Sequence, residues 1–307
     1  MDIAMATCRD WPAGHPEDQL LVSALARIGL EGQAVVWDEV APSNPRHGWL
    51  LRSVWDYHLR LEEFLRWVDV RSAEGALWNS RELIRWNAHK RYLKDLQLRG
   101  LPVIPTLWVR GGDIQDIDLL GRGWKDVVIK PAVGASAHHA VRLPAHAKDE
   151  IRAHTQAITR FTEAMIQPYF PEVESYGERS FFFIEGVFTH AVRRPPALQE
   201  GVDQEVRLAR VEPTDEELAI GRKVIEALPE LPLYARMDLV PDGNGRQHLM
   251  EVELIEPRLF LRESPEAATA LADALGGRIA ESLRASTLKA AARVKGTRIR
   301  PCEQEDL

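Results

Sequence analysis

The run Tyr234–Pro257 reads Tyr-Ala-Arg-Met-Asp-Leu-Val-Pro-Asp-Gly-Asn-Gly-Arg-Gln-His-Leu-Met-Glu-Val-Glu-Leu-Ile-Glu-Pro. Two β-rich segments flank a cluster of turn residues, which predicts a β-hairpin. A turn centred after Gly243 would set Arg236 opposite Glu251, with Asp238 diagonal to Glu251 on the same face. The hairpin therefore carries an arginine among carboxylates.

The two faces of this hairpin are expected to differ, because side chains alternate along a strand. Asp238, Glu251 and Glu253 fall on one face. The side chains expected to point into a core are Met237, Met250, Val252 and Leu254. Clustered carboxylates repel one another unless a positive group lies among them, and Mg²⁺ suits oxygen ligands. The alternative is a half-solvated sheet in which Arg236 neutralises its neighbours.

Composition sets broad limits. A chain of 307 residues with 45% hydrophobic and 28% charged residues suits a globular protein of two or three packed units. The formal charge of −7 argues against a nucleic-acid partner. Cys8 and Cys302 predict no disulfide framework and fit a reducing cytoplasm. No stretch resembles a membrane span or an export signal.

The N-terminal part is expected to be a small α/β unit, because all nine tryptophans lie between Trp11 and Trp124. Its expected elements are strands at 3–7, 34–37 and 50–54 and a helix at 17–28. Arg9, Arg52 and Asp56 follow strand ends, where open α/β sheets bind ligands, and are candidate substrate contacts. Alternatively, the tryptophans pack the domain and Arg52 pairs with Asp56.

A β-branched run from Asp126 ends at Lys130 and Pro131 before a loop of small residues. A lysine beside such a loop suits phosphate, although a hairpin with a solvated lysine gives the same pattern. The remaining expected elements are helices at 60–72, 87–99, 214–227 (with a capping box) and 265–288; strands at 165–170, 179–184 and 187–192; a mobile loop at 193–201; and a disordered tail from 293.

Together these motifs resemble the ATP-grasp ligase superfamily, from about Asn87 to Pro257. The motifs that carry the resemblance are Lys90, Lys130-Pro131, Gln167-Pro168-Tyr169, Arg236-x-Asp238 and Glu251-x-Glu253, in the family's order. The strings Arg-Ser-x-Trp-Asp-Tyr, Gly-Glu-Arg-Ser-Phe-Phe-Phe and Met-Glu-Val-Glu-Leu-Ile-Glu-Pro look most like the small enzymes related to the cycloserine-forming cyclo-ligase. The resemblance implies an α/β ATP-grasp fold with a Rossmann-like pre-ATP-grasp domain, a lid domain and a metal-binding domain.

The resemblance also implies roles for individual residues. Lys90 and Lys130 would hold the nucleotide phosphates. The other cofactor residues would be Gln167, Pro168 and Tyr169 at adenine, Ser136 in the lid, and one of Glu172, Glu174 and Glu178 at the ribose. Arg236, Arg193 and, as a weaker third, Arg207 would meet the transferred phosphate. Asp238, Glu251 and Glu253 would bind Mg²⁺, with two ions expected and Mn²⁺ as a substitute.

Two departures from the family pattern stand out. The lid loop has one glycine, Gly134, so its phosphate contacts would rely on Ser136 or on His138 and His139, which are otherwise expected to face solvent. The segment 201–211 also lacks the glycine pair that commonly follows the acceptor-side arginine.

The expected domains are 1–85 (α/β), 86–185 (linker helix and lid), 186–292 (metal hairpin) and 293–307 (tail). The implied function is ADP-forming ligation of a small-molecule carboxylate, amino-acid-like, to an amine through an acyl phosphate, with ring closure left open. A small-molecule phosphotransferase and a non-catalytic nucleotide-binding protein are the alternatives. No nucleic-acid or membrane partner is expected; a homodimer and a homotetramer both stay open.

Overall fold

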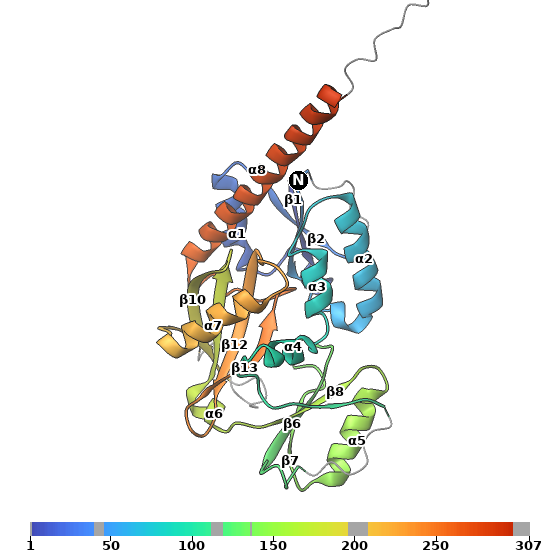
Figure 1. The fold of residues 1–307 in the computed structure, drawn as a ribbon, viewed down its shortest axis with the longest axis vertical. Helices are drawn as coiled ribbons and strands as arrows, with labels where there is room; N and C mark the ends of the chain where they lie inside the picture. The colour runs from blue at the N-terminus through green and yellow to red at the C-terminus, as the bar shows by residue number, and fades with distance from the viewer. Residues whose placement is uncertain (1, 40–45, 112–118, 136, 196–207, 297–307) are drawn as a thin grey trace, which may run out of the picture.

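The structure, a computed structural model, describes residues 2–39, 46–111, 119–135, 137–195 and 208–296. Its strands form three sheets, of four, five and four strands. Figure 1 shows the N-terminal sheet at one end, the five-stranded sheet in the middle and the third sheet at the opposite end. The long helix α8 (Pro265–Gly296) runs beside the first two and extends past the N-terminal sheet.

The N-terminal sheet is parallel and has the order β2-β1-β3-β4. Its strands are β1 (Ile3–Thr7), β2 (Gly32–Val36), β3 (Gly48–Ser53) and β4 (Leu77–Trp78), with helices α1 (Asp18–Arg27) and α2 (Leu61–Glu74) and the 3-10 turn η1 (Tyr57–Arg60). Trp37 and Trp49 are buried against α2, so these tryptophans pack the domain. Helix α1 packs against α8.

The third sheet is antiparallel, in the order β5-β8-β6-β7, and is called the lid below. Its strands are β5 (Leu107–Val109), β6 (Asp126–Pro131), β7 (Val141–Pro144) and β8 (Ala164–Pro168), and α5 (Lys148–Thr159) covers one face. Residues alternate between buried and half-buried along β6, which places Lys130 on the face away from α5 and towards the middle of the molecule.

The five-stranded sheet is antiparallel, in the order β11-β10-β9-β12-β13. Its strands are β9 (Glu178–Ile184), β10 (Val187–Arg194), β11 (Ala209–Val211), β12 (Tyr234–Pro241) and β13 (Gln247–Glu253), with helices α6 (Glu172–Tyr176) and α7 (Asp215–Ala227). The expected capping box forms at Thr214 and Glu217. None of the described helices is long and apolar enough to span a membrane.

The helix expected at 87–99 is wrong, because the chain forms two helices here, α3 (Arg81–Asn87) and α4 (Tyr92–Leu98). Between them the Lys90 amide donates to the Ala132 carbonyl of the lid instead of to the preceding turn. This break brings Lys90 against the lid. The expected domain boundary after residue 185 falls in the turn of the β9–β10 hairpin, whose two strands belong to one sheet. The domain boundaries stay a prediction. Residues 297–307 of the expected tail lie outside the described residues.

The expected hairpin is present, but its register differs. Asp238 pairs with Glu251 and Arg236 with Glu253, so the predicted pairing of Arg236 with Glu251 is wrong. The pairing shifts by one residue between Asp238 and Leu239, which leaves Met250 as the extra residue of a β-bulge. Because a bulge breaks the alternation, Met250 lines the cavity described below instead of joining the core beside Val252.

Two buried asparagines tie the N-terminal part to the five-stranded sheet. Asn79 donates to the carbonyls of Tyr234 and Leu254, each at 2.9 Å, and accepts from the Leu233 amide at 2.6 Å. Asn87 likewise donates to the carbonyl of Val252 and accepts from the Leu254 amide. These side-chain amides thus pair with buried backbone groups of β12, β13 and the residues beside them.

We predict that Asn79→Ala lowers the free energy of unfolding by roughly 2 to 4 kcal/mol, because it leaves three buried backbone groups without a hydrogen-bond partner. Asn244→Ala, at an exposed turn, should change it by less than about 0.5 kcal/mol. Urea unfolding of both variants checks this, and equal midpoints would contradict it.

Candidate active site

A cavity of about 380 Å³ lies between the lid and the β12–β13 hairpin. Its walls include Lys130 from β6, Gln167 and Pro168 from β8, and the acidic face of the hairpin. The apolar side chains of Val240 and Met250 line it as well. Polar groups therefore converge on one apolar-walled cleft, as at small-molecule sites.

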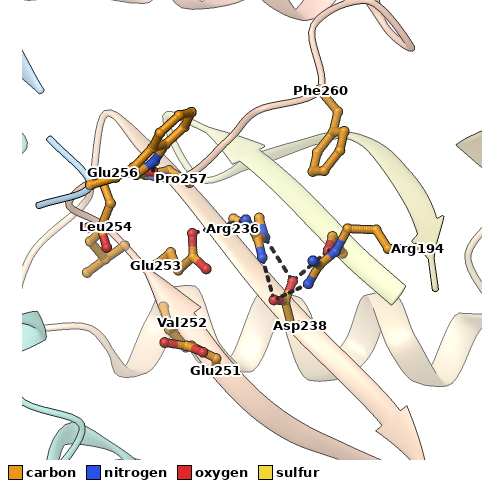
Figure 2. Close-up of polar contacts among 12 residues, drawn as sticks. Arg194, Arg236, Asp238, Glu251, Val252, Glu253, Leu254, Glu256, Pro257 and Phe260 are labelled. Carbon is orange, nitrogen blue, oxygen red and sulfur yellow. Dashed lines mark hydrogen bonds and ion pairs between the residues drawn. The ribbon is translucent and has the colours of Figure 1, made fainter. Parts of the chain in front are cut away.

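Arg236 lies at the centre of the acidic face (Figure 2). Its Nε and Nη2 atoms donate to the two carboxylate oxygens of Asp238 at 2.9 and 2.7 Å, and its Nη1 donates to Glu253 at 3.0 Å. Asp238 also accepts from Ser180 at 2.6 Å and from Arg194 at 2.9 Å. One buried guanidinium thus holds two of the three carboxylates.

Charge and burial shift the ionisation of this group. Burial raises the pKa of Asp238, but Arg236 and Arg194 outweigh burial and hold it well below its usual range. Burial raises the pKa of Glu253 to about 7; Arg236 opposes this rise, whereas Asp238 and Glu251 add to it. The carboxylate at Asp238 is therefore fixed in charge, whereas Glu253 titrates near neutrality.

The two candidate phosphate lysines lie on the same side of the cavity. Lys90 Nζ is 2.5 Å from Glu251 Oε1 and 2.9 Å from the Gly134 carbonyl of the lid loop. Burial lowers the pKa of Lys90, but Glu251 outweighs it and the net pKa is raised. Burial lowers the pKa of Lys130, and Glu251 only partly opposes it. Lys130 is thus a half-buried ammonium group that an anion in the cavity would stabilise.

The arginine of β10 that faces the cavity is Arg194, and not the expected Arg193. Arg194 Nη2 is 2.8 Å from Glu178 and 2.9 Å from Asp238, whereas Arg193 is exposed and does not line the cavity. The sequence has two adjacent arginines here, and the sequence motif does not show which of the two side chains points to the cavity. A residue count from His190, which is buried on the same face as Arg194, would have separated them.

The apolar end of the cavity is formed around the strand end at Gln167, Pro168 and Tyr169. Gln167 donates to Thr106 at 2.9 Å, and the Tyr169 hydroxyl is 2.9 Å from Glu174. The Arg142 guanidinium lies 3.7 Å from the centre of the Tyr169 ring. The expected adenine residues therefore have fixed side chains, and their role stays a prediction.

The three glutamates considered for the ribose are separated by the structure. Glu178 lines the cavity and pairs with Arg194. Glu174 pairs with Arg142, while Glu172 lies beside Gly243 of the hairpin turn, and neither lines the cavity. Binding of the ribose by one of these glutamates stays a prediction.

The expected substrate contacts lie elsewhere. Arg9 is exposed and pairs with Asp38. Arg52 pairs with Asp18 and not with Asp56, so the alternative pairing is wrong, while substrate binding by these residues stays a prediction. Asp56 instead accepts from Trp37 at 2.8 Å and from Arg60 at 3.1 Å. None of these three candidates lines the main cavity.

The cavity end nearest the N-terminal domain is lined instead by Trp55, His138, Glu256 and Arg258. His138 lines the cavity and is exposed, as is the neighbouring His139, so both agree with the expected exposure to solvent. Trp55 donates its indole N–H to the Glu256 carbonyl at 2.9 Å. Burial, with Glu253 nearby, raises the pKa of Glu256 well above its usual value. Ser136 and Arg207 lie outside the described residues.

The oxygen donors of the acidic face suit Mg²⁺ in kind. Within the described ranges, however, no three His, Cys, Asp or Glu side chains are arranged to hold a metal ion. The three carboxylates are already engaged in ion pairs: Arg236 pairs with Asp238 and Glu253, and Lys90 pairs with Glu251. A cation would have to replace some of these ion pairs, so Asp238, Glu251 and Glu253 stay predicted ligands.

Comparisons with known proteins give a matching family model and a relative by sequence. A family model described as the N-terminal domain of D-cycloserine synthetase DcsG matches residues 3–79. The cycloserine biosynthesis protein DcsG of Streptomyces lavendulae is 28% identical over 276 residues, covering 84% of this chain and 92% of its own length. The crystal structure of D-cycloserine synthetase DcsG has a TM-score of 0.84 and 26% identity, over 90% of this chain and 99% of the other.

More distant likenesses extend over nearly whole chains. The ATP-grasp ligase PsnB, complexed with a minimal precursor, Mg and ADP, has a TM-score of 0.62 at 17% identity, over 91% of this chain and 98% of PsnB. The D-alanine–D-alanine ligase of Bacillus anthracis, complexed with ATP, has a TM-score of 0.62 at 15% identity, over 92% of this chain and 98% of the ligase. At these identities the likeness shows a shared fold.

The raised pKa of Glu253 gives a pH prediction. A carboxyl group whose pKa is raised on folding stabilises the fold below its unfolded value, near 4.5, and loses that contribution as pH rises to about 7. Relative to Glu253→Gln, the nucleotide-free protein should therefore lose roughly 1 to 3 kcal/mol of stability between pH 5 and pH 8. Chemical denaturation at both pH values, with exposed Glu281→Gln as control, measures the difference. A constant difference would contradict the assignment.

Proposed function

Because the chain is a homologue of D-cycloserine synthetase with the ATP-grasp fold, we propose that it is an ATP-dependent carboxylate–amine ligase. The resemblance and the α/β ATP-grasp fold expected from the sequence are confirmed. The reaction releases ADP and phosphate and forms an amide-type bond through an acyl phosphate. Its substrates are a small-molecule carboxylate, amino-acid-like, and an amine.

The observation that carries this proposal is the meeting of three kinds of group in one cavity. Lys90, which is buried, and Lys130, which is half-buried, supply positive charge from two different segments of the chain. The hairpin supplies the carboxylates, and Arg194 and Arg236 lie among them. A triphosphate and a carboxylate repel each other, so a site that brings them together must neutralise both.

Each group has a distinct task in this account. The lysines bind phosphate oxygens, and the strand end Gln167–Tyr169 holds the adenine. Mg²⁺, held by Asp238, Glu251 and Glu253, would neutralise charge on the phosphates. Arg236 and Arg194, fixed by Asp238, orient the transferred phosphoryl group. None of these tasks needs a covalent nucleophile from the protein.

The lid supports this assignment by its connections. Lys90 bonds to both the lid loop and Glu251, so one side chain links the lid to the hairpin. A ligase must exclude water from its active site, because water hydrolyses an acyl phosphate. A cytoplasmic location, two metal ions, Mn²⁺ as a substitute and the oligomeric state stay predictions.

An ADP-release screen over amino acids and dipeptides, with mass spectrometry of the products, tests the proposal. We expect ADP and an amide or a ring in equal amounts, only with Mg²⁺ present. A phosphorylated small molecule as the end product would instead identify a phosphotransferase, and ATP binding without any turnover a non-catalytic protein.

Adjacent arginines give a matched pair of variants. Arg194→Ala removes a cation bonded to Asp238 in the cavity, so kcat should fall at least about 100-fold. Arg193→Ala, at the exposed neighbouring position, should stay within about threefold of the parent. Steady-state ADP release measures both. A larger loss for Arg193→Ala would restore the assignment made from the sequence.

A further inference from the structure

Glu256 is a buried carboxyl group for which the proposed reaction has so far no task. It follows β13 by three residues, lines the main cavity and has 8% of its surface exposed. Figure 2 shows it beyond Glu253, well away from Asp238 and Arg194. Its side chain has no hydrogen bond or ion pair with any other described residue. An unpaired buried carboxyl group is costly, and such a group facing a cavity indicates a ligand.

The protein's own cations near Glu256 are already engaged. Lys90 and Arg236 both act on Glu256 electrostatically. Lys90, however, is bonded to Glu251, and Arg236 is bonded to Asp238 and Glu253. A cation or an N–H donor carried by a ligand in the cavity would therefore give the Glu256 carboxylate the partner that the described residues do not supply.

The surroundings of Glu256 fix its position. Trp55 donates its indole N–H to the Glu256 carbonyl at 2.9 Å and lines the cavity beside it. Trp55 in turn packs edge-on against Trp11 and His15 of the N-terminal domain. The carboxyl group is thus presented at the end of the cavity away from Gln167–Phe170 by a rigid aromatic support, as recognition residues require.

We propose that Glu256 is the residue that binds the acceptor amine, by accepting hydrogen bonds from its nitrogen at the Trp55 end of the cavity. The inference rests on the proposed ligase function, in which the other reacting group is a carboxylate and offers no N–H donor to Glu256. Of the two reacting groups, the amine alone offers the positive charge or N–H groups that this carboxyl group lacks. Glu256 then positions the amine for attack on the acyl phosphate and selects an amine over water.

Hydroxylamine separates this task from the earlier phosphoryl transfer. It is a small nucleophile, neutral near pH 7.5, and at high concentration traps an acyl phosphate as a hydroxamate without a bound amine. The experiment uses the full chain with ATP, Mg²⁺, the acid found by the screen and its amine, with and without hydroxylamine. It compares the parent with Glu256→Gln, Glu256→Asp and, as control, the exposed Glu281→Gln.

In Glu256→Gln the ratio of amide or ring product to hydroxamate should fall at least tenfold. ADP release at saturating hydroxylamine should stay within about twofold of the parent, as should the KM for ATP. Glu256→Asp, which keeps the carboxylate, should recover part of the ratio, and Glu281→Gln should match the parent. A general structural defect would lower both products together and leave the ratio unchanged.

Two results would overturn the inference. An unchanged product ratio in Glu256→Gln would show that the amine binds elsewhere, and an equal loss of hydroxamate would place Glu256 in the phosphoryl transfer. If the parent itself gave neither hydroxamate nor amide from any acid of the screen, the ligase function would fail, and the amine site with it.

Discussion

The ion pairs of Arg236 are the interaction on which the rest of the site depends. Three carboxylates and a fourth at Glu256 are gathered in a largely buried place, where unpaired charge is costly. Arg236 offsets part of this cost by holding Asp238 and Glu253 at once. Burial, together with the neighbouring carboxylates, raises the pKa of Glu253, and a bound metal ion would offset the negative charge of these carboxylates.

Much of the fold follows from local patterns in the sequence. Alternating residues on both sides of a turn cluster predicted the hairpin, and Thr214 with Glu217 predicted the start of α7. The register of the hairpin did not follow, because the bulge at Met250 adds one residue to a single strand. Bulges depend on tertiary fit and leave no clear trace in the pattern. The break at Lys90 likewise depends on a hydrogen bond to the distant lid.

The site was also partly predictable, because some of its residues follow from local sequence patterns and others depend on tertiary contacts. Residue types at strand ends identified Lys130 and the hairpin carboxylates, which the structure brings to one cavity. To decide which of two adjacent residues such as Arg193 and Arg194 faces the cavity, one must know which face of the strand is buried. Glu256 was missed because burial of a glutamate after a strand has no sequence signal. Arg9, Arg52 and Asp56 were chosen by their place after strand ends, although nearby ion pairs engage them.

The central claim is that the substrate carboxylate itself attacks the γ-phosphate, with no ester to the protein. Oxygen-isotope transfer tests this most directly. With a substrate labelled with heavy oxygen in its carboxylate, the account predicts one labelled oxygen in inorganic phosphate for each product molecule, together with ADP. Label retained in the product, or release of AMP and pyrophosphate, would contradict the account and indicate an adenylating enzyme.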